Sequence, residues 1–129
     1  MAELCENLDS VFNPTPQPPG CPTKAEYKGG DEIFSPSFPN TPATSHCDYL
    51  LTAGEDKQVQ IYVEAFDSNA CCDSLTLYDG LFSTTVIAEI RGSLIKGATY
   101  HSSGSVMKLV WNSTKGLNSR GFHLWMNEI

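Results

Sequence analysis

Apolar and polar residues alternate along several short stretches of the chain. The clearest alternation covers residues 59–65, and a second one covers residues 74–78. A period of two is typical of a β-strand with one buried face. Asp79-Gly80 follows the second stretch and supplies turn chemistry, because glycine tolerates a positive φ. The two stretches therefore predict a pair of strands, the second of which ends in a tight turn.

Further strand-like stretches follow toward the C-terminus, at residues 84–92, 106–111 and 120–126. Turn-forming residues separate them, and no window of a dozen residues places apolar side chains at helical spacing. Short strands with recurring turns are typical of a sandwich of antiparallel sheets. The pattern predicts an all-β fold.

Length and charge narrow the class of protein. The chain has 129 residues, enough for one domain, and its net charge is −7. Its eight basic residues are scattered, which argues against binding to nucleic acid or to anionic lipid. No apolar run approaches the roughly 20 residues that cross a bilayer, so we expect no membrane insertion.

Proline marks the expected domain boundary. Prolines crowd residues 13–22, where they favour extended backbone. We therefore expect residues 1–20 to be a lead-in or linker and residues 21–129 to be the folded domain. Since the chain opens directly on polar sequence, we expect it to be one module of a longer protein.

Five cysteines indicate the compartment. They lack Cys-x-x-Cys spacing, and the three histidines lack the spacing of zinc ligands. A disulfide-bonded, secreted domain fits this usage best, while unpaired thiols in a cytosolic protein are the alternative. Cys71 and Cys72 are adjacent. Neighbours in a strand face opposite sides, so we expect these two cysteines to have different fates.

Several segments, taken in order, resemble the CUB domain, an extracellular β-sandwich module. The resemblance covers about residues 21–129 and includes a strand of the form Cys-x-aromatic and a central aromatic-Asp, Cys-Asp, x-Leu-x-Leu-x-Asp-Gly signature. The segments that carry it are Ser35–Asn40, Cys47–Tyr49, Phe66–Asp67, Cys72–Gly80 and Gly121–Phe122. The resemblance implies a CUB-like, jelly-roll type β-sandwich of two antiparallel sheets.

The resemblance also implies a disulfide between Cys21 and Cys47. A second family disulfide normally uses a cysteine just before a glycine that matches Gly92, but Arg91 stands at that place. Three cysteines are then left without assigned partners, namely Cys5, Cys71 and Cys72. We expect Cys5 to pair with one of the adjacent two, and the other to be free or to bridge to another molecule.

The resemblance implies a function in binding rather than catalysis. CUB modules commonly mediate protein recognition or adhesion in secreted or membrane-anchored proteins, often beside C-type lectin domains. The expected partner is therefore an extracellular protein. A carbohydrate-binding, lectin-like protein with a glycan ligand is the alternative. No Gly-x-Ser-x-Gly or His-Glu-x-x-His motif is present, so we do not expect an enzyme, although a hydrolase with an unrecognised triad stays as a second competitor.

Carboxylates around the central hairpin are the candidate binding residues, namely Asp67, Asp73 and Asp79. Some CUB domains hold calcium with three acidic side chains at one end of the sandwich, and calcium prefers oxygen ligands. Here Asp73 matches one of them, whereas Asn69 or Asp67 and Ser113 stand near the other places. We therefore expect no high-affinity calcium site and no other cofactor; a calcium ion held by Asp67, Asp73 and backbone carbonyls is the alternative.

One sequence triplet is a modification signal. Asn112-Ser113-Thr114 is an acceptor for N-linked glycosylation, and we expect it to lie in a loop. Asn13-Pro14-Thr15 is excluded by its proline.

Overall fold

The computed structural model describes residues 16–40, 44–114 and 119–129. All regular secondary structure in these ranges is β-strand. The strands run in the order β1 (Glu32–Phe34), β2 (Ser45–Thr52), β3 (Val59–Asp67), β4 (Asp73–Tyr78), β5 (Val86–Ile90), β6 (Ser93–Leu94), β7 (Thr99–His101), β8 (Val106–Ser113) and β9 (Gly121–Glu128).

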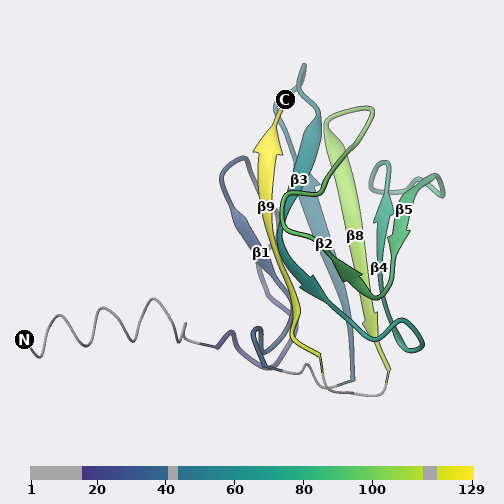
Figure 1. Cartoon of the computed structure of the whole chain (residues 1–129). Helices are drawn as coiled ribbons and strands as arrows, with labels where there is room; N and C mark the ends of the chain where they lie inside the picture. The colour runs from purple at the N-terminus through teal and green to yellow at the C-terminus, as the bar shows by residue number, and fades with distance from the viewer. Residues whose placement is uncertain (1–15, 41–43, 115–118) are drawn as a thin grey trace, which may run out of the picture.

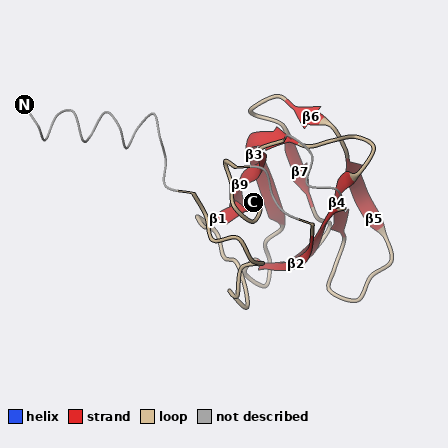
Figure 2. Cartoon of the chain, turned by 90° about the horizontal axis from the view of Figure 1, so that it is seen from below, coloured by secondary structure: helices blue, strands red, loops and turns tan. Residues whose placement is uncertain are grey.

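The strands form two sheets that face each other (Figures 1 and 2). One sheet has the order β2-β8-β4-β5, and the other has the order β1-β9-β3-β6, with β7 also paired to β3. All pairs between named strands are antiparallel. The predicted all-β sandwich of two antiparallel sheets is therefore confirmed.

The core lies between the sheets and follows the alternation that the sequence shows. On β8, Met107, Leu109 and Trp111 are fully buried, whereas the residues between them are partly exposed. On β9, Phe122 takes part in the same core, and its ring centroid lies 5.1 Å from that of Trp111. Burying one face of each long strand removes apolar surface from water, which drives the two sheets together.

The end of the proline-rich segment is hydrogen-bonded to the folded domain already before residue 21. The amide of Gln17 donates to the carbonyl of Phe38 at 2.9 Å, and the amide of Ser37 donates to the carbonyl of Pro18 at 2.9 Å. Residues 36–39 form the turn after β1 that the resemblance implied. Residues 17 and 18 therefore pair with this turn, while residues 1–15 lie outside the described part of the chain.

Across the described ranges, no helix is long and apolar enough to span a membrane.

Candidate functional site

The three candidate binding carboxylates do not share one site. Asp67 ends β3 and Asp73 begins β4, so both flank the connection between these strands. Asp79 follows the other end of β4, six residues farther along, and a strand of that length spans about 20 Å. Only Asp67 and Asp73 therefore lie at the same end of the sandwich.

Asp67 and Asp79 are engaged in hydrogen bonds to distant parts of the chain. Asp67 accepts hydrogen bonds from the Ser93 hydroxyl at 3.2 Å and from the Arg120 amide at 3.1 Å. Asp79 accepts from both the amide and the hydroxyl of Ser103, at 3.0 and 2.7 Å. Because all four carboxylate oxygens have donors, these two side chains fix loops in place.

Asp73 is the buried member of the three, with 1% of its surface exposed. Its Oδ2 accepts a hydrogen bond from the Asn69 amide at 2.9 Å, and among the described residues its Oδ1 has no hydrogen-bond partner. Ser113, its register partner on β8, likewise buries a hydroxyl without one. A small polar cluster therefore closes this end of the core.

This cluster is a poor match for a calcium site. It offers one carboxylate, that of Asp73, beside the amide side chain of Asn69 and the hydroxyl of Ser113. Asp67 already has donors on both oxygens, and the described residues contain no group of three or more His, Cys, Asp or Glu side chains that could hold a metal ion. Calcium sites use six to eight oxygen ligands, several of them anionic, so the residues present do not fit that ion well.

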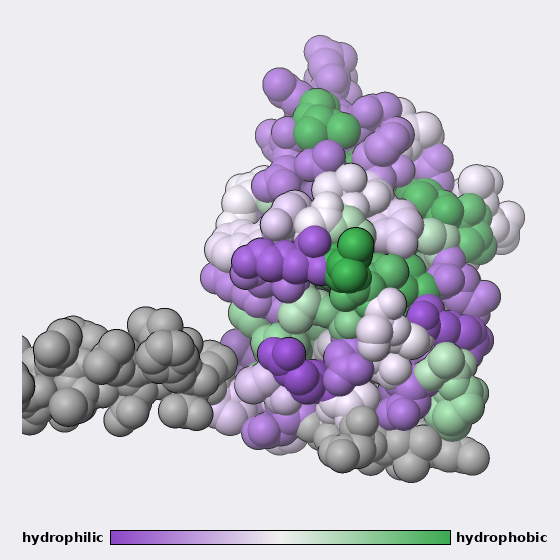
Figure 3. All heavy atoms as spheres, viewed as in Figure 1, coloured by the Kyte–Doolittle hydropathy of each residue, from purple (hydrophilic) through white to green (hydrophobic). Residues whose placement is uncertain are grey.

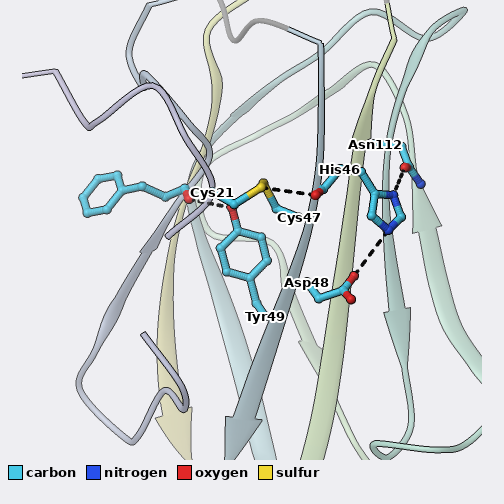
Figure 4. The surroundings of a disulfide bond; sticks show 7 residues. Cys21, His46, Cys47, Asp48, Tyr49 and Asn112 are labelled. Carbon is cyan, nitrogen blue, oxygen red and sulfur yellow. Dashed lines mark hydrogen bonds and ion pairs between the residues drawn. A yellow bond between two sulfur atoms is a disulfide. The ribbon is translucent and has the colours of Figure 1, made fainter. Parts of the chain in front are cut away.

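The disulfide between Cys21 and Cys47 joins the segment before β1 to β2 (Figure 4). It is the pairing that the resemblance implied, with 5.5 Å between the Cα atoms and 26 residues of sequence separation. Cys47 is almost fully buried. The bond fastens the N-terminal segment to the edge of the four-stranded sheet.

Cys71 and Cys72 are joined to each other, which corrects the expectation that they have different fates. That expectation assumed a strand, in which adjacent side chains face opposite sides. The structure places both residues in the turn between β3 and β4, where this alternation does not apply. Neither is then available to Cys5, the expected partner, which lies outside the described residues.

Asn112 lies within β8 rather than in a loop, because pairing with β2 and β4 continues through Ser113. Its side-chain oxygen is hydrogen-bonded to Nδ1 of His46, whose Nε2 lies 3.6 Å from Asp48 (Figure 4). His46 is exposed, so this group sits on the outer face of the four-stranded sheet. The expectation that Asn112 lies in a loop was therefore wrong, because the acceptor triplet itself does not distinguish a loop from a strand.

Histidines are not paired with nucleophiles in the described ranges. His46 binds Asn112, His101 contacts the Ser102 carbonyl, and His123 binds Glu32 at 2.7 Å. Cys47, next to His46, is held in a disulfide. No histidine side chain there is hydrogen-bonded to a serine hydroxyl or a cysteine thiol, so none has the contact that a hydrolase triad needs.

The two tryptophans differ in position. Trp111 is fully buried and offers no surface to a ligand. Trp125 is partly exposed on the outer face of the five-stranded sheet, with its ring 5.7 Å from that of His123. The His123 ring stacks on Phe34 at 4.3 Å. These rings pack against one another along the sheet.

A hollow of about 480 Å³ lies between the segment after residue 16 and β1. Tyr27 and Phe34 contribute rings to its lining, together with three prolines. Its charged groups are engaged: Lys24 pairs with Asp31 at 2.8 Å, and Glu32 pairs with His123. The hydrogen bond from Lys24, with a second from the Lys28 amide, holds the pKa of Asp31 below its ordinary value. The hollow therefore presents mainly apolar surface.

Of the five large apolar side chains that are exposed in the described part of the chain, three belong to the turn between β4 and β5 or to the first residue of β5, and the other two are Ile95 and Ile129. Phe82 is 92% exposed, and Leu81 in the same turn and Val86 at the start of β5 are exposed as well. Figure 3 shows an apolar patch at the right-hand edge of this face, where Figure 1 places the same turn. The sequence marked this turn by Asp79-Gly80, and Leu81 and Phe82 follow that dipeptide directly.

The described strands define a sandwich of two antiparallel sheets. The sequence model of the family described as "CUB domain" matches residues 21–125. The chain therefore belongs to the CUB domain family.

Curated relatives and solved structures agree with this. The chain is 26% identical to rat cubilin over 96 residues and 27% identical to dog cubilin over 114, covering 70% and 87% of this chain. It spans only 3% of the length of either cubilin. The full extracellular region of zebrafish Gpr126/Adgrg6 matches with a TM-score of 0.70 and 24% identity, over 85% of this chain and 15% of that one. The MASP-1 CUB2 domain bound to Ca²⁺ matches with a TM-score of 0.65 and 19% identity, over 78% of this chain and 96% of that one.

Proposed function

We propose that this chain is a non-catalytic, protein-binding module of a larger secreted or membrane-anchored extracellular protein. The observation that carries the proposal is the apolar tip formed by Leu81, Phe82 and Val86, of which Phe82 is 92% exposed. Water-exposed apolar side chains gathered at one place are typical of surfaces that bind another protein. The match to an extracellular region supports the compartment.

The environments of Asp79 and Trp111 support a protein partner rather than a sugar. Sugar recognition needs free polar groups beside an exposed ring. The nearest carboxylate in the sequence, that of Asp79, already accepts two hydrogen bonds from Ser103. The ring of Trp111 is fully buried and so cannot stack on a sugar. A glycan ligand, and with it a lectin-like function, therefore has less support than a protein.

A glycan on Asn112 would leave the tip accessible. Asn112 pairs in register with Ser74 near the start of β4, whereas the tip follows Tyr78 at the other end. Tyr78 lies four positions after Ser74, which is about 13 Å along the strand. Adhesion would be one use of such a module, and a neighbouring C-type lectin domain would fit the family resemblance.

The test displays the domain as a multivalent probe on an array of purified extracellular protein domains and, in parallel, on a glycan array. We expect protein hits that Phe82→Ser weakens by tenfold or more, as for a central interface residue. The matched control is Ile95→Ser, which removes a side chain that is 84% exposed in the loop between β6 and β7. Binding that Ile95→Ser abolishes and Phe82→Ser spares, or hits on glycans alone, would overturn the proposal.

A further inference from the structure

The turn between β3 and β4 contains a disulfide between adjacent residues, Cys71 and Cys72. Cys71 is exposed and Cys72 is partly exposed, whereas the other disulfide joins the exposed Cys21 to the almost fully buried Cys47. Attack by an external thiol needs access to a sulfur atom. Of the two described disulfides, the bond between Cys71 and Cys72 is thus the one in which neither cysteine is buried, so an external thiol can approach it from either residue.

Backbone hydrogen bonds hold this turn without help from the sulfur atoms. The Asn69 carbonyl accepts hydrogen bonds from the amides of Cys72 and Asp73 at 3.0 and 2.9 Å. The Cys72 carbonyl accepts from the amide and the hydroxyl of Thr114, at 3.2 and 2.8 Å. The turn is thus fastened to the end of β8, so the surrounding fold does not depend on the disulfide.

The two disulfides also differ in how much chain each one closes. A disulfide stabilises a fold mainly by restricting the unfolded chain, and the effect grows with the length of the closed loop. The bond from Cys21 to Cys47 spans 26 residues, whereas the bond from Cys71 to Cys72 spans one. In this chain-entropy model, folding shifts the reduction equilibrium of the Cys21–Cys47 bond toward the disulfide by roughly a hundredfold more than that of the Cys71–Cys72 bond.

We propose that the Cys71–Cys72 pair is a reversible thiol–disulfide exchange site, which an extracellular low-molecular-weight thiol reduces while the Cys21–Cys47 bond persists. The thiolate of the small molecule attacks Sγ of Cys71, the bond between the two cysteines breaks, and Cys72 leaves as a thiolate. A second thiol then attacks the mixed disulfide on Cys71 and releases the oxidised small molecule and a second cysteine thiolate. The two electrons gained by the protein come from the two small thiols.

Adjacency makes the exchange reversible. After the first step, the Cys72 thiolate stays next to the mixed disulfide on Cys71 because one peptide unit joins the two residues. It therefore attacks back in an intramolecular reaction and expels the small thiol. The fully reduced pair presents two neighbouring thiols, a ligand set for thiophilic reagents such as trivalent arsenicals, which bond to both sulfur atoms.

The test equilibrates the full chain in glutathione buffers of graded ratio, quenches with acid, and counts reduced cysteines by differential alkylation and mass spectrometry. We expect Cys71 and Cys72 to become reduced at a ratio of reduced to oxidised glutathione about a hundredfold lower than Cys21 and Cys47 do. Over that interval, near-ultraviolet circular dichroism stays native, and immobilised phenylarsine oxide captures the protein.

Two variants separate this site from other thiols. Cys71→Ser leaves a single cysteine in the turn, so glutathione stays attached to Cys72 and arsenical capture through the pair is lost. Cys5→Ser leaves the titration of Cys71 and Cys72 unchanged. A non-reduced peptide map that joins Cys71 or Cys72 to Cys5 would overturn the proposal, as would reduction of both disulfides over the same range or loss of native circular dichroism when the pair opens.

Discussion

The Tyr49 hydroxyl donates a hydrogen bond of 2.9 Å to the backbone carbonyl of Phe34. Tyr49 lies on β2 and Phe34 on β1, so this bond crosses from the four-stranded sheet to the five-stranded one (Figure 4). The Tyr49 side chain is almost fully buried, and burial raises the pKa of its hydroxyl well above the ordinary value. A buried hydroxyl group thus joins the two sheets by a hydrogen bond.

Tyr49→Phe should lower the free energy of unfolding by about 1–2 kcal/mol at pH 7, because the partly buried Phe34 carbonyl loses its hydrogen-bond donor. Urea denaturation measures the difference. The Tyr62→Phe variant is the control, since that ring lies outside the core. A loss no larger than that of the control would show that the hydroxyl contributes nothing.

We also expect the difference in stability between the wild type and Tyr49→Phe to change at high pH. The folded state keeps Tyr49 protonated, so its stabilising effect is complete below the unfolded pKa of about 10 and is lost as the pH rises above that value. Over that range, the wild type should lose up to about 1.4 kcal/mol per pH unit more than Tyr49→Phe does. The stabilities of the two proteins should therefore converge in urea denaturation between pH 10 and 11. A constant difference over this range would contradict the prediction.

Gly121→Ala should destabilise the domain by more than about 2 kcal/mol. Gly121 has a φ of +87°, and a Cβ there would lie 2.0 Å from the Ser35 hydroxyl oxygen. That oxygen is buried and accepts a hydrogen bond from the Phe122 amide at 2.8 Å, so it cannot move without losing a partner. Gly104→Ala is the matched control, because a Cβ at Gly104 meets nothing within 4 Å. Equal thermal unfolding midpoints for the two variants would refute this account.

Calorimetric titration should find no saturable binding of calcium at micromolar concentrations. The reason is the ligand set: of the three candidate carboxylates, only Asp73 has an oxygen without a hydrogen-bond partner in the described structure, and removing anionic ligands weakens a calcium site by orders of magnitude. The MASP-1 CUB2 domain, whose structure contains Ca²⁺, serves as the positive control. Saturable binding that Asp73→Ala abolishes would disprove the prediction.

Expression behind a secretion leader should yield a chain with one N-linked glycan, on Asn112. The triplet meets the acceptor rule, and the side chain lies on the outer face of the four-stranded sheet beside the exposed His46. Treatment with a peptide N-glycosidase should increase electrophoretic mobility, and Asn112→Gln should remove that shift completely. A shift that persists in Asn112→Gln would place the glycan elsewhere.

The sequence alone determined the class of fold, because a strand with one buried face repeats its apolar residues every two positions. The long strands β3, β8 and β9 all show this period. Strands β1, β6 and β7 have three residues or fewer, too few to reveal an alternation. These short strands form because a longer neighbour, β9 or β3, is already in place to pair with them.

The chemistry of the individual side chains was decided by tertiary structure. Asp67 and Asp79 looked like available ligands in the sequence, yet their donors come from residues 24 to 53 positions away. Cys71 and Cys72 were expected to separate because strand geometry was assumed, but the chain turns at that point and brings the two sulfur atoms together. Local periodicity records which face of a strand is buried, whereas the partners of a polar side chain depend on which distant segments the folded sheets bring beside it.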